Sequence, residues 1–184
     1  MKILFLGDIV GQPGVDLVRL ALPTLVAREG IDLVVANAEN ASGGSGMTPR
    51  VYRQLRAAGV DLVTMGDHIY KKAELRSVLE KEDRICKPAN FPAEAPGRDV
   101  IYAPAKDGTL VAVVSLLGRT FMRPVDCPFH AIDRLLPAIH DKTRCVVVDI
   151  HAEATGEKYL VAHHLKAVRQ RLRIQNTPRR KPII

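Results

Sequence analysis

Short apolar runs alternate along this chain with longer stretches in which apolar residues recur every three or four positions. The short runs predict buried β-strands, and the periodic stretches predict amphipathic helices. On this basis we expect strands over residues 2–7, 32–40, 60–66, 99–105, 109–118 and 144–151. We expect helices over residues 15–29, 48–59, 71–82, 127–140 and 157–175.

Turn and cap residues support these boundaries. Thr48 precedes Pro49 and therefore predicts an N-cap followed by a first helical turn, which Gly59 follows at the other end. Pro23 lies within the first predicted helix and should kink or interrupt it. The Lys-Asp-Gly turn at residues 106–108 predicts a β-hairpin between the two strands around it.

Strands that alternate with helices predict an α/β fold with a largely parallel sheet. The hairpin over residues 99–118 adds a mixed or second sheet. At 184 residues we expect one domain, formed by residues 1–162. Residues 163–184 should form a basic helical tail with a loose C-terminal end.

Polar side chains follow four of the predicted strands. Ligands of α/β proteins bind beyond the C-terminal ends of the strands, so we expect these side chains at one edge of the sheet. Carboxylates, an amide and imidazoles without a thiolate form the ligand set of a Mn, Fe, Zn or Mg site. A bridging carboxylate between separate ligands can hold two ions, which generate a hydroxide nucleophile and clamp a phosphoryl group. The residues are Asp8, Asn37, Glu39, Asn40, Asp67, His68, Asp149, His151 and Glu153.

Each residue of this set also has an ordinary structural explanation. Asp8 could cap a helix, and Asn40 could form a loop. His68 could be a surface histidine and His151 a hydrogen-bonded core histidine. Their coincidence at four strand ends favours a metal or phosphate site.

A glycine-rich segment, Gly-Gly-Ser-Gly at residues 43–46, follows the second strand. Its backbone N–H groups could approach a phosphate, or the segment could be a plain loop. The segment lacks the lysine of a Walker A motif, and residues 7–14 do not match the dinucleotide-binding pattern G-x-G-x-x-G. A nucleotide-binding Rossmann domain therefore has little support.

The net charge of +7 belongs to the C-terminal end, because residues 1–165 are formally neutral. An electrostatic argument for RNA binding is thus restricted to the tail, where stacking aromatics are absent apart from Tyr159. A solvated basic helix explains the same residues. They are Lys166, Arg169, Arg171, Arg173, Arg179, Arg180 and Lys181.

The remaining composition indicates a protein of the cytoplasm. Cys86, Cys127 and Cys145 fit neither a disulfide framework nor a C-x-x-C metal site, so we expect reduced and mostly buried thiols. No apolar run approaches the roughly 18 residues that span a bilayer, and the N-terminus does not resemble a signal peptide. We expect no membrane partner.

Six segments together resemble the YmdB-like branch of the calcineurin-type metallophosphoesterases. The likeness extends over residues 1–158, and the motifs occur in order. The resemblance implies an α/β/β/α sandwich with a dinuclear metal centre of iron or manganese, with magnesium or zinc as further options. It also implies phosphodiesterase activity that includes 2′,3′-cyclic nucleotides. The segments are KILFLGDIVGQPG, NAENASGGSGMT, TMGDHIYKK, KPANFP, LLGRTFM and DIHAEATGEK.

The resemblance also implies a role for each strand-end residue. Asp8 would bind the first metal, and Glu39 would bridge the two metals. Asn40 would support the first metal and the phosphate. Asp67 and His151 would bind the second metal, and His68 would bind substrate and act as general acid on the leaving oxygen.

This chain departs from the family pattern at two places. The family has asparagine where this chain has Asp67, and the extra charge should favour metal binding and weaken substrate attraction. The family also continues to a Thr-His-Thr-His strand end, which is absent here. The adjacent His163 and His164 lie in a predicted helix and point about 100° apart.

We therefore expect a second sheet whose C-terminal part is missing or replaced, in a truncated relative or an altered reading frame. An exposed sheet edge would follow, with marginal stability, aggregation or a homo-oligomer. Three functions stay open. They are a metal-dependent phosphodiesterase, a degenerate relative that binds metal or RNA with little turnover, and RNA binding through the tail.

Overall fold

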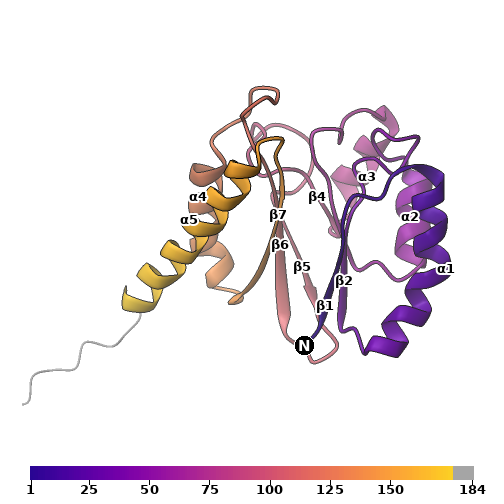
Figure 1. Cartoon of the computed structure of the whole chain (residues 1–184), viewed down its shortest axis with the longest axis horizontal. Coiled ribbons are helices and arrows are strands. Elements are labelled where there is room, and N and C mark those ends of the chain that lie inside the picture. Colours follow the sequence, from indigo (N-terminus) through magenta and orange to yellow (C-terminus); the bar gives the residue numbers. More distant parts are fainter. Residues whose placement is uncertain (176–184) are drawn as a thin grey trace, which may run out of the picture.

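The computed structural model describes residues 1–175, which form two β-sheets between two layers of helices (Figure 1). The first sheet is parallel throughout, and its four strands lie in the order β1-β2-β3-β4. In the second sheet, β5 and β6 are antiparallel while β6 and β7 are parallel. The strands are β1 (Ile3–Leu6), β2 (Leu33–Asn37), β3 (Leu62–Thr64), β4 (Ile85–Cys86), β5 (Val100–Pro104), β6 (Leu110–Leu117) and β7 (Cys145–His151).

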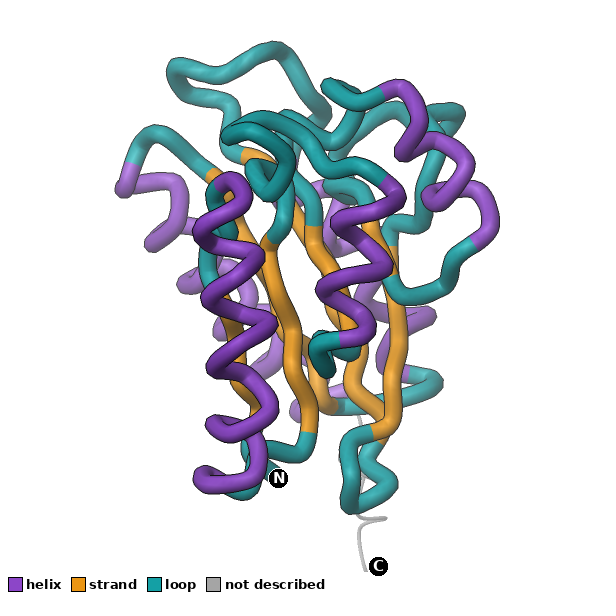
Figure 2. The backbone as a smooth tube through the Cα atoms, turned by 90° about the vertical axis from the view of Figure 1, so that its right-hand side faces the viewer, coloured by secondary structure: helices purple, strands orange, loops and turns teal. Residues whose placement is uncertain are grey.

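Helices cover the outer face of each sheet. On the side of the first sheet are α1 (Gly11–Glu29), α2 (Pro49–Ala57), the 3₁₀ turn η1 (Ala73–Leu75) and α3 (Arg76–Lys81). On the side of the second sheet are α4 (Pro128–His140) and α5 (Thr155–Gln175). The predicted α/β/β/α sandwich is therefore confirmed. Figure 2 shows α1 and α2 in front of the strands, with many loops gathered at one end of the sheets.

Alternation along the strands decides which side chains face the neighbouring sheet. Leu33 and Val35 of β2 belong to the core between the two sheets, whereas Val34 and Ala36 pack under the helices. On β7, Val147 contacts the core between the sheets, and its neighbours pack against α4 and α5. Because side chains alternate with a period of two, the next odd-numbered residues of both strands also point between the sheets.

The extent of burial differs between β2 and β7. Every residue of β2 is buried, as expected for a parallel strand with a neighbour on each side and cover on both faces. Every residue of β7 is only partly buried. Within residues 1–175, no strand pairs with the outer edge of β7.

Most predicted elements are confirmed, with a few differences. The Thr48 cap is present, since its Oγ1 accepts a hydrogen bond from the N–H of Val51 at 3.3 Å. α1 begins at Gly11 and continues through Pro23 without interruption. The two-residue strand β4 was not predicted, because two residues show no periodicity. The prediction of one common sheet edge is wrong for β7, which belongs to the second sheet.

The C-terminal predictions are tested only in part. α5 crosses the predicted domain boundary at residue 162 as one continuous helix, so the division between domain and tail stays a prediction. The predicted loose end at residues 176–184 lies outside the described residues. Among the described helices, none has the length and apolarity that crossing a membrane requires. The three cysteines are free, and Cys86 alone is fully buried.

Candidate metal centre

Backbone hydrogen bonds connect the loops that follow the first three strands. The N–H of Ile9 donates to the carbonyl of Asn37 at 3.1 Å, and the N–H of Ala38 donates to Thr64 at 3.1 Å. The N–H of Gly11 donates to the carbonyl of Asn40 at 2.9 Å. These bonds hold the polar segments after β1, β2 and β3 side by side, which brings the predicted residues into one area.

Asp149 joins the two sheets just below this area. Its Oδ2 accepts hydrogen bonds from Asn37 Nδ2 at 3.0 Å and from Thr64 Oγ1 at 2.6 Å. Asn37 and Thr64 are buried in the first sheet, whereas Asp149 comes from β7. Sequence reasoning placed Asn37 and Asp149 at strand ends without assigning them a partner, and it missed Thr64. The contact of Asp149 with Asn37 and Thr64 depends on how the two sheets pack, which a sequence pattern does not show.

A second contact between the sheets lies two residues further along both segments. Glu39 is only 1% exposed, and its Oε1 lies 2.6 Å from Nδ1 of His151. Its Oε2 accepts a hydrogen bond from the backbone N–H of His68 at 3.4 Å. The hydrogen bond to Glu39 raises the pKa of His151 to about 9, against the opposing effect of partial burial. The protonated imidazole therefore offsets the buried carboxylate when no metal is bound.

Asp67 completes a group of possible metal ligands with these two residues. One ligand atom from each of Glu39, Asp67 and His151 lies within 4.8 Å of the others. Asp67 Oδ1 is buried and has no hydrogen-bond partner in the described part of the chain. A buried carboxylate oxygen without a partner costs free energy, so a cation between these side chains would satisfy it. The residues present thus fit a metal ion, and the donor set suits Mn, Fe, Zn or Mg.

Asp8, Asn40 and His68 form a second group beside the first. Asn40 Nδ2 donates to both carboxylate oxygens of Asp8, at 3.0 and 2.9 Å. Asn40 Oδ1 lies 2.6 Å from Nδ1 of His68, so Nδ1 carries a proton and donates it. This assignment leaves Nε2 of His68, which lies 3.9 Å from Asp67, as the atom that can exchange a proton with a substrate.

Gly66 makes room for the buried carboxylate. A Cβ atom at this position would overlap the carboxylate of Glu39. Gly66 directly follows Met65 at the end of β3, where the chain turns into Asp67 and His68. A glycine is therefore required at position 66 by the close approach of the Glu39 carboxylate.

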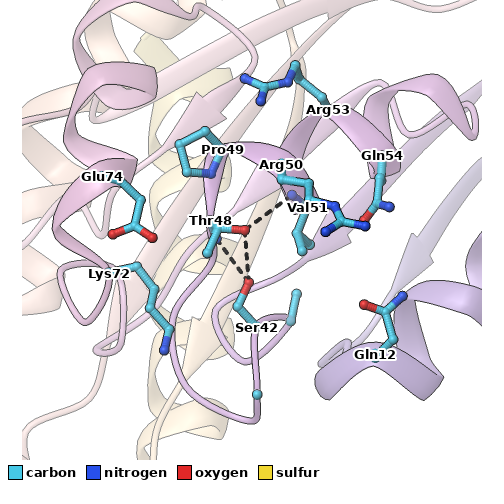
Figure 3. A pocket seen from close by; sticks show the side chains of 12 residues that line it. Gln12, Ser42, Thr48, Pro49, Arg50, Val51, Arg53, Gln54, Lys72 and Glu74 are labelled. Atoms are coloured by element: carbon cyan, nitrogen blue, oxygen red, sulfur yellow. Dashed lines mark hydrogen bonds between the residues drawn. The ribbon is translucent and has the colours of Figure 1, made fainter.

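An open cleft of about 740 Å³ is lined in part by the loop that follows Asn40, and none of the residues of the two groups above lines it (Figure 3). Arg50, Arg53 and Lys72 give it a positive lining, against one acidic residue, Glu74. Figure 3 shows a hydrogen bond between the Ser42 and Thr48 side chains. Ser42 Oγ also accepts a hydrogen bond from the N–H of Thr48 at 2.9 Å. The cleft is therefore suited to an anionic part of a ligand.

The glycine-rich segment does not offer a phosphate cradle in this conformation. The N–H groups of Gly44 and Ser45 donate to the carbonyls of Asn40 and Ser42. The N–H of Gly46 donates to the carbonyl of Glu39. Because these groups are used within the loop, the segment is better explained as a loop that holds Glu39 and Asn40.

The structure thus brings together all six residues that the sequence singled out for the site. The adjacent histidines of α5 lie elsewhere, since Nε2 of His164 pairs with Asp133 of α4 at 2.7 Å. Among the described residues, one group of three metal-ligating side chains is assembled. The six residues are Asp8, Glu39, Asn40, Asp67, His68 and His151.

Comparison with known proteins identifies the family. The sequence model of the YmdB-like protein family matches residues 4–170. The chain belongs to the YmdB-like family. The predicted resemblance is therefore confirmed over nearly the whole described chain.

Individual relatives agree with this assignment. The 2′,3′-cyclic-nucleotide 2′-phosphodiesterase of Bacillus subtilis is 40% identical over 158 residues, which are 86% of this chain and 60% of that protein. A hypothetical protein from Thermus thermophilus has the same fold, with 44% identity and a TM-score of 0.83 over 90% of this chain and 63% of the other. A Mycoplasma pneumoniae protein described as a novel phosphatase gives 28% identity and a TM-score of 0.80 over 90% of this chain and 60% of the other.

These neighbours support the calcineurin-like sandwich architecture inferred from the sequence. The chain spans about three-fifths of the length of the relatives it matches. What those longer proteins do therefore comes to this chain as a proposal.

Proposed function

We propose that this YmdB-like protein hydrolyses phosphodiesters, with 2′,3′-cyclic nucleotides as the first substrates to test. The observation that carries the proposal is the group of Glu39, Asp67 and His151, in which the buried Asp67 Oδ1 has no partner in the described chain. The name of the Bacillus subtilis relative supports the substrate class.

We further propose that the centre holds two ions, iron or manganese before magnesium or zinc. Glu39, Asp67 and His151 would hold one ion, and Asp8 with Asn40 would contribute to the other. Ions in such a centre neutralise phosphate charge and lower the pKa of water, which supplies a nucleophile at neutral pH. Removing an ion with a chelator should abolish hydrolysis, and adding manganese should restore it.

In this proposal the residues around the ions bind the substrate and transfer a proton. Asn40 holds the Nδ1 proton of His68 and orients the ring. Nε2 of His68 then protonates the leaving oxygen, as a general acid does. The Asn40 amide and the positive lining of the neighbouring cleft, with Arg50 and Arg53, bind and orient the anionic substrate.

The test compares manganese-dependent hydrolysis of 2′,3′-cyclic AMP by four proteins. Relative to wild type, His68→Ala should lower kcat by about 10²- to 10⁴-fold, while the manganese content per chain stays unchanged. Asp8→Ala should lower both manganese content and activity. His163→Ala changes an exposed histidine on α5 and is the matched control. Equal activity of wild type and Asp8→Ala would refute the proposal.

A degenerate, weakly active relative is the second candidate. The observation that favours it is the single group of three ligands among the described residues. Inductively coupled plasma mass spectrometry distinguishes the two candidates by counting ions. Two ions per chain would contradict degeneracy, and one ion without turnover would support a metal-binding module.

RNA binding through the basic tail stays a prediction. Lys166 is exposed on α5, and the side chains of the other six tail residues lie outside the described ones. If the basic tail binds RNA, deleting residues 165–184 should abolish that binding.

A further inference from the structure

The connection between β6 and α4 lies directly beside the candidate centre. Figure 1 shows it rising past the upper ends of β6 and β7. At its start, the N–H of Gly118 donates to the carbonyl of His151 at 2.8 Å. A Cβ atom at Gly118 would lie only 2.6 Å from Cβ of Ala152. The base of this loop therefore packs against the segment that carries His151.

Phe121 at the tip of this loop is held outward. The residue is 89% exposed, more than any other large hydrophobic side chain of the described chain. Its φ is +64°, the sole positive value at a non-glycine residue in the described part. L-residues other than Asn and Asp rarely adopt this conformation, and functional sites are where such strain is commonly kept.

The loop is anchored on both sides of its tip. The carboxylate of Glu157 accepts hydrogen bonds from the N–H groups of Arg119, at 3.0 and 3.1 Å, and Thr120, at 3.1 Å. The N–H of Asp126 donates to the carbonyl of Asn90 at 3.0 Å. These hydrogen bonds hold the backbone before and after Phe121, so the exposed ring belongs to an ordered loop.

Two arginines lie two positions before and two positions after Phe121 in the chain. Arg119 and Arg123 are exposed, and neither side chain has a hydrogen-bond or ion-pair partner among residues 1–167. An exposed aromatic ring in a loop that also carries exposed arginines is a combination with which proteins bind nucleotides. The ring stacks on a base, and arginine binds phosphate or stacks as well.

The loop of Phe121 begins at the segment that carries His151. Phe121 follows Gly118 by three positions, so their Cα atoms lie at most about 11 Å apart. Gly118 itself contacts the chain at His151. A nucleotide held by its phosphodiester at the centre would extend its base toward this loop to contact Phe121.

We propose that Phe121 is a specificity-determining residue that stacks on the base of a nucleotide substrate, with Arg119 and Arg123 attracting its anionic part. This inference rests on the proposed function and narrows it. The centre would prefer phosphodiesters that carry a nucleobase over those that do not.

Binding can be measured without turnover by using 2-aminopurine riboside 3′-monophosphate, whose fluorescence is quenched when the base stacks. Phe121→Gly removes the ring and suits the positive φ, so it should keep the loop conformation. Phe121→Ala removes the ring in the strained conformation, and Phe121→Trp restores a stacking surface. Leu20→Ala changes a residue that is 81% exposed on α1 and is the control.

We expect quenching with wild type, Phe121→Trp and Leu20→Ala. Phe121→Gly and Phe121→Ala should lose it and raise Kd by about 5- to 100-fold, the usual loss for one stacked base. Affinities of the two ring-deleted variants within twofold of wild type, or no quenching with wild type, would overturn the proposal. So would unchanged quenching together with a lower oligomeric state of the ring-deleted variants, which would identify Phe121 as a subunit contact.

Kinetics separate this inference from the proposed function. Phe121→Gly should lower kcat/KM for 2′,3′-cyclic AMP and leave it unchanged for ethylene phosphate, a cyclic phosphodiester without a base. If wild type hydrolyses both substrates and Phe121→Gly affects neither, the proposed function stands and the base site is refuted. If wild type hydrolyses neither but Phe121-dependent quenching persists, the proposed activity is wrong and the base site stands.

Discussion

Two of the side-chain contacts between the sheets lie two residues apart on each strand. We name the contact of Asn37 with Asp149 the first pair and the contact of Glu39 with His151 the second pair. Both combine one residue of the segment that contains β2 with one residue of β7. The i, i+2 spacing is the same on both sides, because alternate residues point to the same face of a strand.

The two pairs differ in how completely their polar atoms are satisfied. In the first pair, Asp149 Oδ2 accepts from both Asn37 and Thr64, in the sheet interior. The second pair lies next to Asp67, whose Oδ1 has no partner within the described residues. A satisfied network holds sheets together, whereas an unsatisfied one next to it offers a place for a ligand. We therefore assign the first pair to stability and the second to metal binding.

Glu39→Gln is the change with the largest expected effect. The amide can still accept a hydrogen bond from His151 Nδ1, so the variant should stay folded. Loss of the charge from a metal ligand should weaken manganese binding by more than about 100-fold, since losing a group behind a ligand already costs 10- to 100-fold. Isothermal titration calorimetry measures the affinity, and wild-type affinity in this variant would remove Glu39 from the centre.

Asp149→Ala should lower the stability of the fold, in contrast to Glu39→Gln, which should lower metal affinity. Asn37 Nδ2 and Thr64 Oγ1 would lose their acceptor inside the protein, which should lower the free energy of unfolding by about 2–5 kcal/mol. Urea denaturation of the metal-free protein measures the difference.

The control for this prediction is Asp133→Ala, which breaks the exposed contact with His164 and should cost less than about 1 kcal/mol. If the two variants had equal stability, the first pair would have no special role in joining the sheets.

Gly66→Ala should move the Glu39 carboxylate without removing it. The added methyl group would overlap that carboxylate, so metal affinity should fall by about 10- to 100-fold while the chain stays folded. Gly7→Ala is the matched control, because Gly7 also follows a strand and a Cβ there meets nothing within 4 Å. Equal metal affinity of the two variants would show that the space at Gly66 is unimportant.

Asp67→Asn has the smallest expected effect on metal affinity. It removes one negative charge and keeps a ligand oxygen, so manganese affinity should fall by about tenfold. KM for an anionic phosphodiester should decrease at the same time, because the repulsion of the phosphate is reduced. Glu153→Gln removes a charge 3.7 Å from His151 without removing a ligand and should change both quantities less. An increase of KM in Asp67→Asn would contradict this account.

The sequence predicted the members of the second pair but not their arrangement. Glu39 and His151 stand out because polar residues follow apolar strands, a signal that needs no tertiary information. The contact between them requires β7 to face β2 from another sheet, and the sequence pattern did not distinguish this from a shared edge. Thr64 of the first pair carries no signal, because threonine is common in strands.

The same limit explains the loop of Phe121. The segment Leu-Leu-Gly-Arg-Thr-Phe-Met was part of the family resemblance, but its sequence does not reveal that Phe121 is exposed. The backbone just before Phe121 is held by hydrogen bonds to Glu157, which is more than thirty positions away in the chain. The homo-oligomer expected from an exposed sheet edge stays a prediction, for which the open side of β7 is the place to look.

The most direct test of the central claim is a crystal structure of the protein soaked in manganese, with anomalous data collected to locate the metal. The account predicts an anomalous peak in contact with Glu39, Asp67 and His151, and its loss in Glu39→Gln crystals. A manganese-loaded protein whose anomalous peaks all lie away from these three side chains would contradict the account.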